Sequence, residues 1–247
     1  MDRFAYIAAA AAKQVQFAQG VNAHNLANAS TTGFKQDLVE AETVYLVGEG
    51  AQSRAYSVIP DVPADFRAGM LEQTGREYDI AINGEGWFAV LGEDGTESLT
   101  RRGDLRIDEF GQLRNGEGLA LMGNDGPIAL PPASSLSIAT DGTISIVPLG
   151  EPPNAIAVLD RIKMVNPPVE SLRKTSSGLI QSGDGLPLIA DGTIRLATGS
   201  LEASNVNPIS AMVSMIELAR QFEHHMKLLK TAEDLDTSSA SLMRLQS

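Results

Sequence analysis

The chain has 247 residues, with 31 acidic and 19 basic side chains and a formal net charge of −12 at pH 7. This charge disfavours binding to nucleic acid or to an anionic membrane surface, because phosphate groups are bound through Lys and Arg. The absence of cysteine excludes disulfides, thiolate metal centres and a cysteine nucleophile, while 43% hydrophobic residues suffice for a globular core.

Residues 1–35 are predicted to form the N-terminal helix of a discontinuous α domain. The segment up to about residue 28 is rich in Ala and Gln, which are good helix formers, and the S-T-T-G sequence at 30–33 breaks the helix. Apolar side chains recur at heptad steps, and most are small enough to let a partner helix approach closely: Phe4, Ile7, Ala11, Ala18 and Val21.

The apolar run at residues 4–12 has an alternative interpretation as the hydrophobic part of a secretory signal peptide, with Arg3 before it. Asp2 offsets the charge of Arg3, and the helical pattern continues past Lys13. The sequence therefore favours a helix that belongs to the mature protein. No run approaches the ~20 apolar residues of a membrane-spanning helix, so no membrane insertion is expected.

Residues 36–78 are expected to form an extended, irregular connector that carries short strands, because Gly and Pro recur there without a sustained period. Residues 79–200 predict a central all-β domain of short strands and Gly turns. The N-G-E-G sequence at 83–86 is expected to be a hairpin turn, and the phrase D-G-T-I occurs at 141–144 and 191–194. Among the carboxylates of this region, Asp79 is the candidate for burial.

Residues 201–247 predict the C-terminal helix of the α domain, with Ser204 or Asn205 as its N-cap and Pro208 in its first turn. The fold class is therefore α+β: the terminal helices flank the central β domain and would pair as a coiled-coil layer, with each other or with other chains. The heptad positions of the C-terminal helix are Met212, Met215, Ala219, Phe222, Met226 and Leu229.

The sequence contains few motifs of the kind that catalyse a reaction or bind a cofactor or metal ion. Residues 84–89 match the dinucleotide fingerprint G-x-G-x-x-A, but the residues that follow the glycines are typical of a strand, and the fingerprint needs a helix there. His224 and His225 are adjacent, so on a helix they cannot both face one metal ion. No catalytic, cofactor or metal site is predicted; a secreted enzyme, such as a cell-wall hydrolase, would need a pair of carboxylates in a cleft.

Four segments resemble, in order, the signatures of the bacterial flagellar rod and hook proteins: residues 25–35, 79–88, 99–105 and 199–206. Three residues depart from the family pattern, since Trp87 stands where Phe is commoner, Leu99 where Tyr is usual, and Arg102 where Asn or Asp is usual. Within the family, residues 150–154 and 219–227 resemble the proximal-rod type. A distal-rod or hook-type axial subunit is the alternative.

The resemblance implies a non-enzymatic structural subunit without a cofactor. Such subunits are exported unfolded, without cleavage of a signal peptide, through the flagellar type III export apparatus. They assemble helically into the rod that crosses the periplasm, transmits motor torque and lines the export channel. The partners implied are copies of the chain itself and the rod subunits FlgB, FlgC and FlgG.

The resemblance also implies that the two terminal helices form the inner layer of the rod, with the β domain outside. Residues at the end of the first helix would set its termination and the turn of the chain outward. The assembly interface is expected at Phe4, Ile7, Ala11, Val15, Ala18, Val21, Asn25, Leu26, Asn28, Gly33 and Phe34 in the N-terminal segment, and at Met212, Met215, Ile216, Ala219, Phe222, Met226 and Leu229 in the C-terminal helix.

Overall fold

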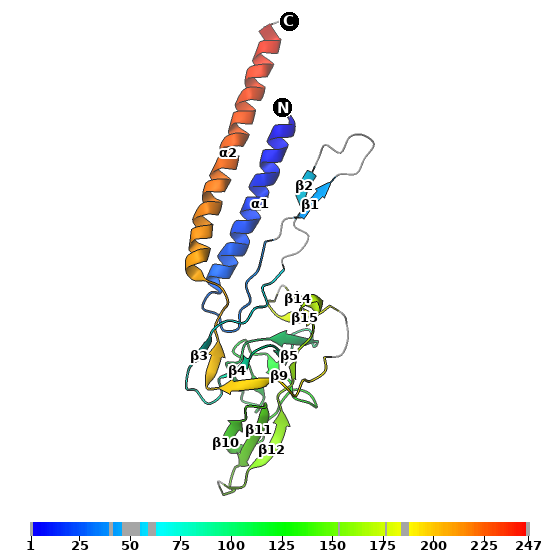
Figure 1. Cartoon of the computed structure of the whole chain (residues 1–247), viewed down its shortest axis with the longest axis vertical. Coiled ribbons are helices and arrows are strands. Elements are labelled where there is room, and N and C mark those ends of the chain that lie inside the picture. The colour runs from blue at the N-terminus through cyan, green and yellow to red at the C-terminus, as the bar shows by residue number, and fades with distance from the viewer. Residues whose placement is uncertain are drawn as a thin grey trace. The chain divides into compact units, whose positions relative to one another are not determined.

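The computed structural model describes residues 2–39, 42–45, 55–58, 63–152, 154–175, 177–183 and 188–245, without the side chains of 2–5, 42–45, 55–58, 236 and 239–245. The chain divides into two compact units (Figure 1). The helical unit comprises Met1–Asn28, Asp37–Pro63 and Val206–Ser247, and the β unit comprises Ala29–Gln36 and Ala64–Asn205.

The helical unit is built from two antiparallel helices that lie side by side, α1 (Asp2–Ala27) and α2 (Pro208–Leu245) (Figure 1). It also holds a two-stranded antiparallel pair, β1 (Glu42–Tyr45) and β2 (Ala55–Val58). The end of α1 agrees with the sequence prediction, and both ends of the chain contribute a helix, as expected for an α+β fold.

The cap of α2 differs from the prediction. Asn207, rather than Ser204 or Asn205, caps the helix, since its Oδ1 accepts hydrogen bonds from the backbone N–H groups of Ile209 (3.0 Å) and Ser210 (3.1 Å). Pro208 lies at the first helical position, where its missing N–H costs nothing. The cap immediately precedes the proline, so Asn205 is available for another role.

Small side chains are buried in the helical unit. Ala8, Ala12 and Val15 of α1 and Ala211 of α2 are buried, and the Asn22 side-chain amide donates to the carbonyl oxygen of Ala211 (2.8 Å). Because apolar stabilisation grows with the area removed from water, an alanine-rich contact contributes little per residue. The helical unit therefore has a thin core.

The β unit contains four groups of paired strands. The largest sheet has the order β14-β15-β6-β5-β9-β8-β7, with β13 also paired to β5; a second has the order β10-β11-β12, and β16 pairs with β4 and β17 with β3. The strands are β3 (Leu71–Gln73), β4 (Ile80–Asn83), β5 (Trp87–Leu91), β6 (Glu97–Thr100), β7 (Arg106–Ile107), β8 (Leu113–Arg114), β9 (Ala120–Leu121), β10 (Ala133–Ile138), β11 (Thr143–Pro148), β12 (Ala157–Arg161), β13 (Met164–Val165), β14 (Leu172–Lys174), β15 (Ile180–Ser182), β16 (Arg195–Thr198) and β17 (Ser200–Glu202).

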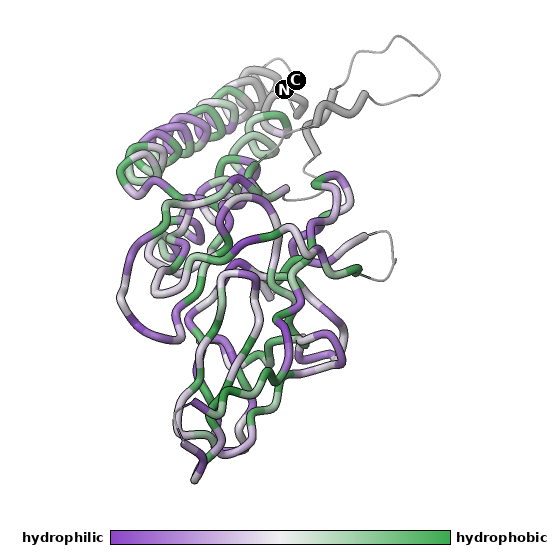
Figure 2. The backbone as a smooth tube through the Cα atoms, turned by 60° about the horizontal axis from the view of Figure 1, so that its bottom comes forward, coloured by the Kyte–Doolittle hydropathy of each residue, from purple (hydrophilic) through white to green (hydrophobic). Residues whose placement is uncertain are grey.

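The core of the β unit is closed by large apolar side chains. Ile80, Phe88, Leu113 and Ile144 come from different strands, and each is fully buried in one cluster. A second cluster gathers around Trp87 and Leu99. Figure 2 shows the same pattern along the chain, with hydrophobic strand segments separated by hydrophilic turns. The β unit therefore has an apolar core of its own.

The turn at residues 83–86 is not a hairpin turn, and that prediction was wrong. β4 pairs with β16, whereas β5 pairs with β6, β9 and β13. Gly84 (φ +100°) and Gly86 (φ +124°) adopt backbone conformations that favour glycine and lead the chain from one sheet into another. Because β5 follows directly, the helix that a dinucleotide fingerprint needs is not there.

The D-G-T motif forms the same kind of turn each time it occurs. Asp141 Oδ1 accepts a hydrogen bond from the Thr143 backbone N–H (3.0 Å), and Asp191 Oδ1 accepts one from the Thr193 backbone N–H (2.8 Å). The D-G-T sequence at 94–96 makes the same contact. Each aspartate holds the turn that starts the next segment, as the sequence predicted for 141–144 and 191–194.

Candidate functional site

The candidate assembly residues on α1 lie at different depths. Val15 and Asn25 are buried, whereas Ile7 is exposed; Ala11, Ala18, Val21, Leu26, Asn28, Gly33 and Phe34 are intermediate, and the side chain of Phe4 lies outside the described residues. The most buried apolar positions of α1, Ala8 and Ala12, fall one residue from the expected stripe. The heptad count alone could not choose among so many alanines.

The candidates on α2 differ in exposure. Met215, Phe222 and Leu229 are half-buried, whereas Met212, Ile216, Ala219 and Met226 are exposed. Ile209, Met212 and Ile216, which share one face with Val213, are 74%, 54% and 56% exposed. This set, Ile209, Met212, Val213 and Ile216, is called the outer row below. It is an apolar helix face without a covering element in the described chain.

Farther along α2, a groove of about 890 Å³ is lined by apolar and charged side chains. Phe222, Met226 and Leu229 supply its apolar surface. Two acids and two bases border it, so its charges are balanced: Glu223, Glu233, Lys227 and Lys230. Such a lining suits an amphipathic helix better than a strongly charged ligand.

Asn25 holds the chain after α1. Its Oδ1 accepts a hydrogen bond from the Asp37 backbone N–H (2.8 Å), and its Nδ2 donates to the Asp37 carbonyl oxygen (2.7 Å). Gly33, with φ +68°, lies so close to the backbone of Arg101 that a Cβ there would be 2.5 Å from a carbonyl carbon. Only glycine fits this position, which follows the end of the helix.

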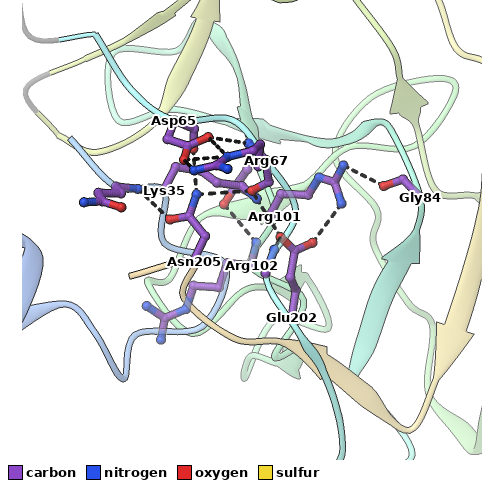
Figure 3. Close-up of polar contacts among 11 residues, drawn as sticks. Lys35, Asp65, Arg67, Gly84, Arg101, Arg102, Glu202 and Asn205 are labelled. Carbon is purple, nitrogen blue, oxygen red and sulfur yellow. Dashed lines mark hydrogen bonds and ion pairs between the residues drawn. The ribbon is translucent and has the colours of Figure 1, made fainter. Parts of the chain in front are cut away.

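The β unit contains a buried charge cluster made of Lys35, Arg101 and Glu202 (Figure 3). Their side chains are 2%, 3% and 0% exposed, respectively. Glu202 Oε1 accepts hydrogen bonds from Lys35 Nζ (2.6 Å) and the Gly69 backbone N–H (2.9 Å), and Oε2 accepts one from Arg101 Nη1 (2.8 Å). One carboxylate therefore forms ion pairs with two buried cations, and the three side chains together carry one excess positive charge.

The two cations of the cluster also donate to carbonyl oxygens and lie near an aromatic ring. Lys35 Nζ donates to the Arg67 carbonyl oxygen (2.8 Å), and Arg101 Nη2 donates to the Gly84 carbonyl oxygen (2.9 Å). Both cations also lie near the ring of Trp87, at 5.6 and 5.0 Å from its centroid. Burial lowers the pKa of the Lys35 ammonium below its usual value, and the opposing attraction of Glu202 offsets only part of this.

Sequence reasoning missed this cluster and looked instead at Asp79. Asp79 is fully buried, as suspected, and accepts a hydrogen bond from Thr74 Oγ1 (2.6 Å). Glu202 is equally buried, but its two cations lie about 100 and 167 residues away along the chain. A signal was present, because Lys35, Arg101 and Glu202 each lie in one of the segments that carry the family resemblance.

In the described part of the chain, no group of three or more His, Asp or Glu side chains is arranged to hold a metal ion. His24 Nδ1 instead lies 2.8 Å from an Asp37 carboxylate oxygen. None of the described helices combines the length and the apolar character needed to cross a membrane.

Comparison with known proteins decides the family. Residues 81–146 match the flagellar hook protein FlgE/F/G D1 domain, and residues 197–242 match the flagellar basal body rod FlgEFG protein C-terminal domain. The flagellar basal-body rod protein FlgF of Salmonella typhimurium is 37% identical over 99% of this chain and 100% of its own length. The FlgF of Escherichia coli is 38% identical over 95% of both chains. The chain belongs to the FlgF-type flagellar basal-body rod proteins.

A relative of the FlgG type is less similar than these two FlgF proteins. FlgG of Buchnera aphidicola subsp. Schizaphis graminum is 30% identical over 89% of this chain and 92% of its own length. The preference for the FlgF type over the FlgG type is therefore confirmed. FlgF-type rod proteins are structural proteins and not enzymes, so the hydrolase alternative is set aside.

Proposed function

We propose that this FlgF-type protein is a subunit of the proximal part of the flagellar rod, where it transmits motor torque and lines the export channel. The observation that carries this proposal is the 37–38% sequence identity to FlgF proteins over nearly the full length of the chain. The expected partners are copies of the chain and FlgB, FlgC and FlgG, and the expected location is the rod where it crosses the periplasm.

The surface of the helical unit supports assembly through α1 and α2. The outer row and the groove beside Phe222 together place exposed apolar side chains along α2. Each large side chain contributes about 1.5–3 kcal/mol when fully buried, so covering a row of them with a neighbouring helix is strongly favourable. We infer that helices of neighbouring rod subunits cover this surface and complete a coiled-coil layer. Phe4, Ile7 and the other candidates named above would line that layer.

Export through the flagellar type III apparatus is part of the same proposal. Residues 4–12, the stretch that could be mistaken for a signal peptide, belong to α1, and Ala8 and Ala12 are buried. Cleavage within this stretch would remove part of the helical unit. Mass spectrometry of the protein recovered from purified basal bodies tests this: the peptide containing residues 4–12 is expected, and its loss would contradict retention.

The assembly proposal can be tested with a single thiol, because the chain contains no cysteine. Met212→Cys places the thiol on the outer row, and Ala211→Cys places it on the adjacent, buried position as a matched control. A photocrosslinker attached to the introduced thiol should join Met212→Cys to rod subunits in intact flagellated cells, and mass spectrometry identifies the products. The same reagent should leave Ala211→Cys without such products.

The identity of the crosslinked partner separates the two positions in the rod. Products that include FlgB or FlgC, with or without FlgG and a second copy, support a proximal-rod subunit. Products restricted to FlgG and hook subunits would favour the alternative of a distal-rod or hook-type position. A strain that lacks the gene and still swims would contradict the rod function altogether.

A further inference from the structure

The chain crosses the boundary of the β unit at four places: before Ala29, after Gln36, before Ala64 and after Asn205. The last three are called the exits below, and hydrogen bonds join them into a ring. The Asp65 backbone N–H donates to the Gln36 carbonyl oxygen (2.7 Å), the Gln36 backbone N–H donates to Asn205 Oδ1 (2.8 Å), and Asn205 Nδ2 donates to the Asp65 carbonyl oxygen (2.8 Å). A single asparagine side chain thus contacts both of the other exits.

The buried charge cluster reinforces the same three exits (Figure 3). Glu202 is three residues from the last exit, and its carboxylate binds Lys35, which precedes the first exit. The same carboxylate oxygen accepts from Gly69, on the segment that follows the second exit. The backbone carbonyl oxygen of Glu202 accepts a further hydrogen bond from Gly33 (2.7 Å). Arg101 then ties Glu202 to the strand-bearing body of the β unit.

We propose that Glu202 and Asn205 act as positioning residues that gather the three exits of the β unit into one anchor, so that a force applied at any exit is shared by all three. This inference rests on the proposed rod function, which requires a subunit to carry torque. Charge-assisted hydrogen bonds are roughly twice as strong as neutral ones, and a buried charge that leaves its partner is left uncompensated. The anchor therefore resists the opening of any one exit.

Hydrogen exchange on the purified full-length chain tests the anchor through Asn205→Ala. This substitution removes a half-buried amide without changing charge, so the core of the β unit should remain intact. Exchange at the Gln36 amide, and in peptides that cover residues 64–70, should become about tenfold faster, since the hydrogen bonds of the Asn205 side chain to Gln36, Asp65 and Arg67 are lost together. Peptides from β5 should not change. Asn124→Ala, in an exposed turn, is the matched control and should change neither region.

Faster exchange at only one of the two exits would overturn the proposal, because the exits would then be held separately. Unchanged exchange at both would overturn it as well. A uniform acceleration that includes β5 would also count against it, since Asn205 would then support the β unit as a whole.

The charge cluster has its own reporter, because Trp87 is the only tryptophan in the chain and lies beside both cations. Glu202→Gln should make Trp87 more accessible to acrylamide quenching, while Glu117→Gln should not. Glu117 forms an ion pair with Arg102 at 3.2 Å, but it is 43% exposed. Equal quenching in Glu202→Gln and the parent chain would show that the carboxylate does not hold the cluster together.

If Glu202→Gln does not fold, the Asn205→Ala exchange pattern decides alone. The result for the anchor can be distinguished from the result for the proposed rod function. Failure of the rod function would appear as missing crosslinks in cells and would leave the exchange pattern of the isolated chain unaltered.

Discussion

The helical unit and the β unit bury their apolar surface in opposite ways. The β unit encloses large side chains such as Ile80, Phe88 and Leu113, and none of these is exposed to solvent. The helical unit buries alanines and leaves Ile209 and Ile216 in water. The difference indicates that the β unit is stable by its own contacts, whereas the helical unit depends on neighbours for much of its stability.

The two units also differ in how their polar groups are used. In the β unit, the buried carboxylate of Glu202 is fully committed to Lys35, Gly69 and Arg101. Along α2, charged residues such as Glu223 and Lys230 border an open apolar groove. The polar contacts of Glu202 are therefore buried inside the β unit. On the helical unit, charged side chains instead border an apolar surface that a partner can cover.

The largest expected effect concerns the closed core. Phe88→Ala should lower the free energy of unfolding of the β unit by about 3–5 kcal/mol, because it leaves a cavity where a fully buried ring was. Phe110→Ala is the matched control: this ring is 85% exposed, and its loss should change stability by less than about 0.5 kcal/mol. Urea denaturation followed by Trp87 fluorescence measures both. Equal effects would contradict the assignment of the core.

The second expected effect is an asymmetry within the charge cluster. Glu202→Gln should lower the free energy of unfolding by about 3–5 kcal/mol, because it leaves two buried cations without an anion. Lys35→Met should cost clearly less, since the remaining Arg101–Glu202 pair is neutral. The same urea titration gives both values. A Lys35→Met variant as unstable as Glu202→Gln would show that the excess positive charge is not what makes Glu202 important.

The third prediction separates assembly from folding. Phe222→Asp introduces a charge at a half-buried position beside the α2 groove, so incorporation into basal bodies should be lost. The thermal transition of the β unit, followed by Trp87 fluorescence, should not move. Gln221→Ala, at the adjacent exposed residue that does not line the groove, should assemble normally. A Phe222→Asp protein that is soluble but has a melted β unit would break the comparison between the two units.

The smallest expected effect is a dependence on acid. Hydrogen bonds from the backbone and side chain of Thr143 lower the pKa of the Asp141 carboxyl below its usual value of about 4. A lowered pKa in the folded state means that the stabilisation is present above the unfolded pKa and is lost as the pH falls through the folded pKa.

Asp141→Asn should therefore flatten the decline of stability below about pH 4, with little change in the slope above it. Asp125→Asn, an exposed aspartate in another turn, is the control. Urea titrations at several acid pH values provide the measurement. If the free energy of unfolding of Asp141→Asn falls with acid as steeply as that of the parent chain, the Asp141 carboxylate does not stabilise the turn.

Local features of the fold could be predicted from the sequence because their causes are local. The end of α1, the strand character of residues 88–90 and the D-G-T turns depend on neighbours within a few residues. The partner of β4 could not be predicted, because β16 lies more than 100 residues farther along the chain. A turn signal indicates a change of direction, and it does not say which strand will lie alongside.

The candidate site follows the same rule. The apolar positions of α2 could be identified from their spacing, although spacing does not reveal that Met215 faces inward and Met212 faces solvent. The buried charge cluster could not be foreseen, because the burial of Glu202 depends on cations from two distant segments. The cap at Asn207 was also missed, because Ser204 and Asn205 are equally good capping residues by type alone.

Peptide-resolved hydrogen exchange, compared between the dilute full-length chain and purified basal bodies, measures whether the helical unit depends on assembly for its protection. In the dilute chain, strands β4, β5 and β6 should exchange slowly, and α1 and α2 should exchange fast; in basal bodies, both helices should become protected. If α1 and α2 are as protected as the β strands in the dilute chain, the helical unit has a self-sufficient core, and the claim that it depends on assembly is contradicted.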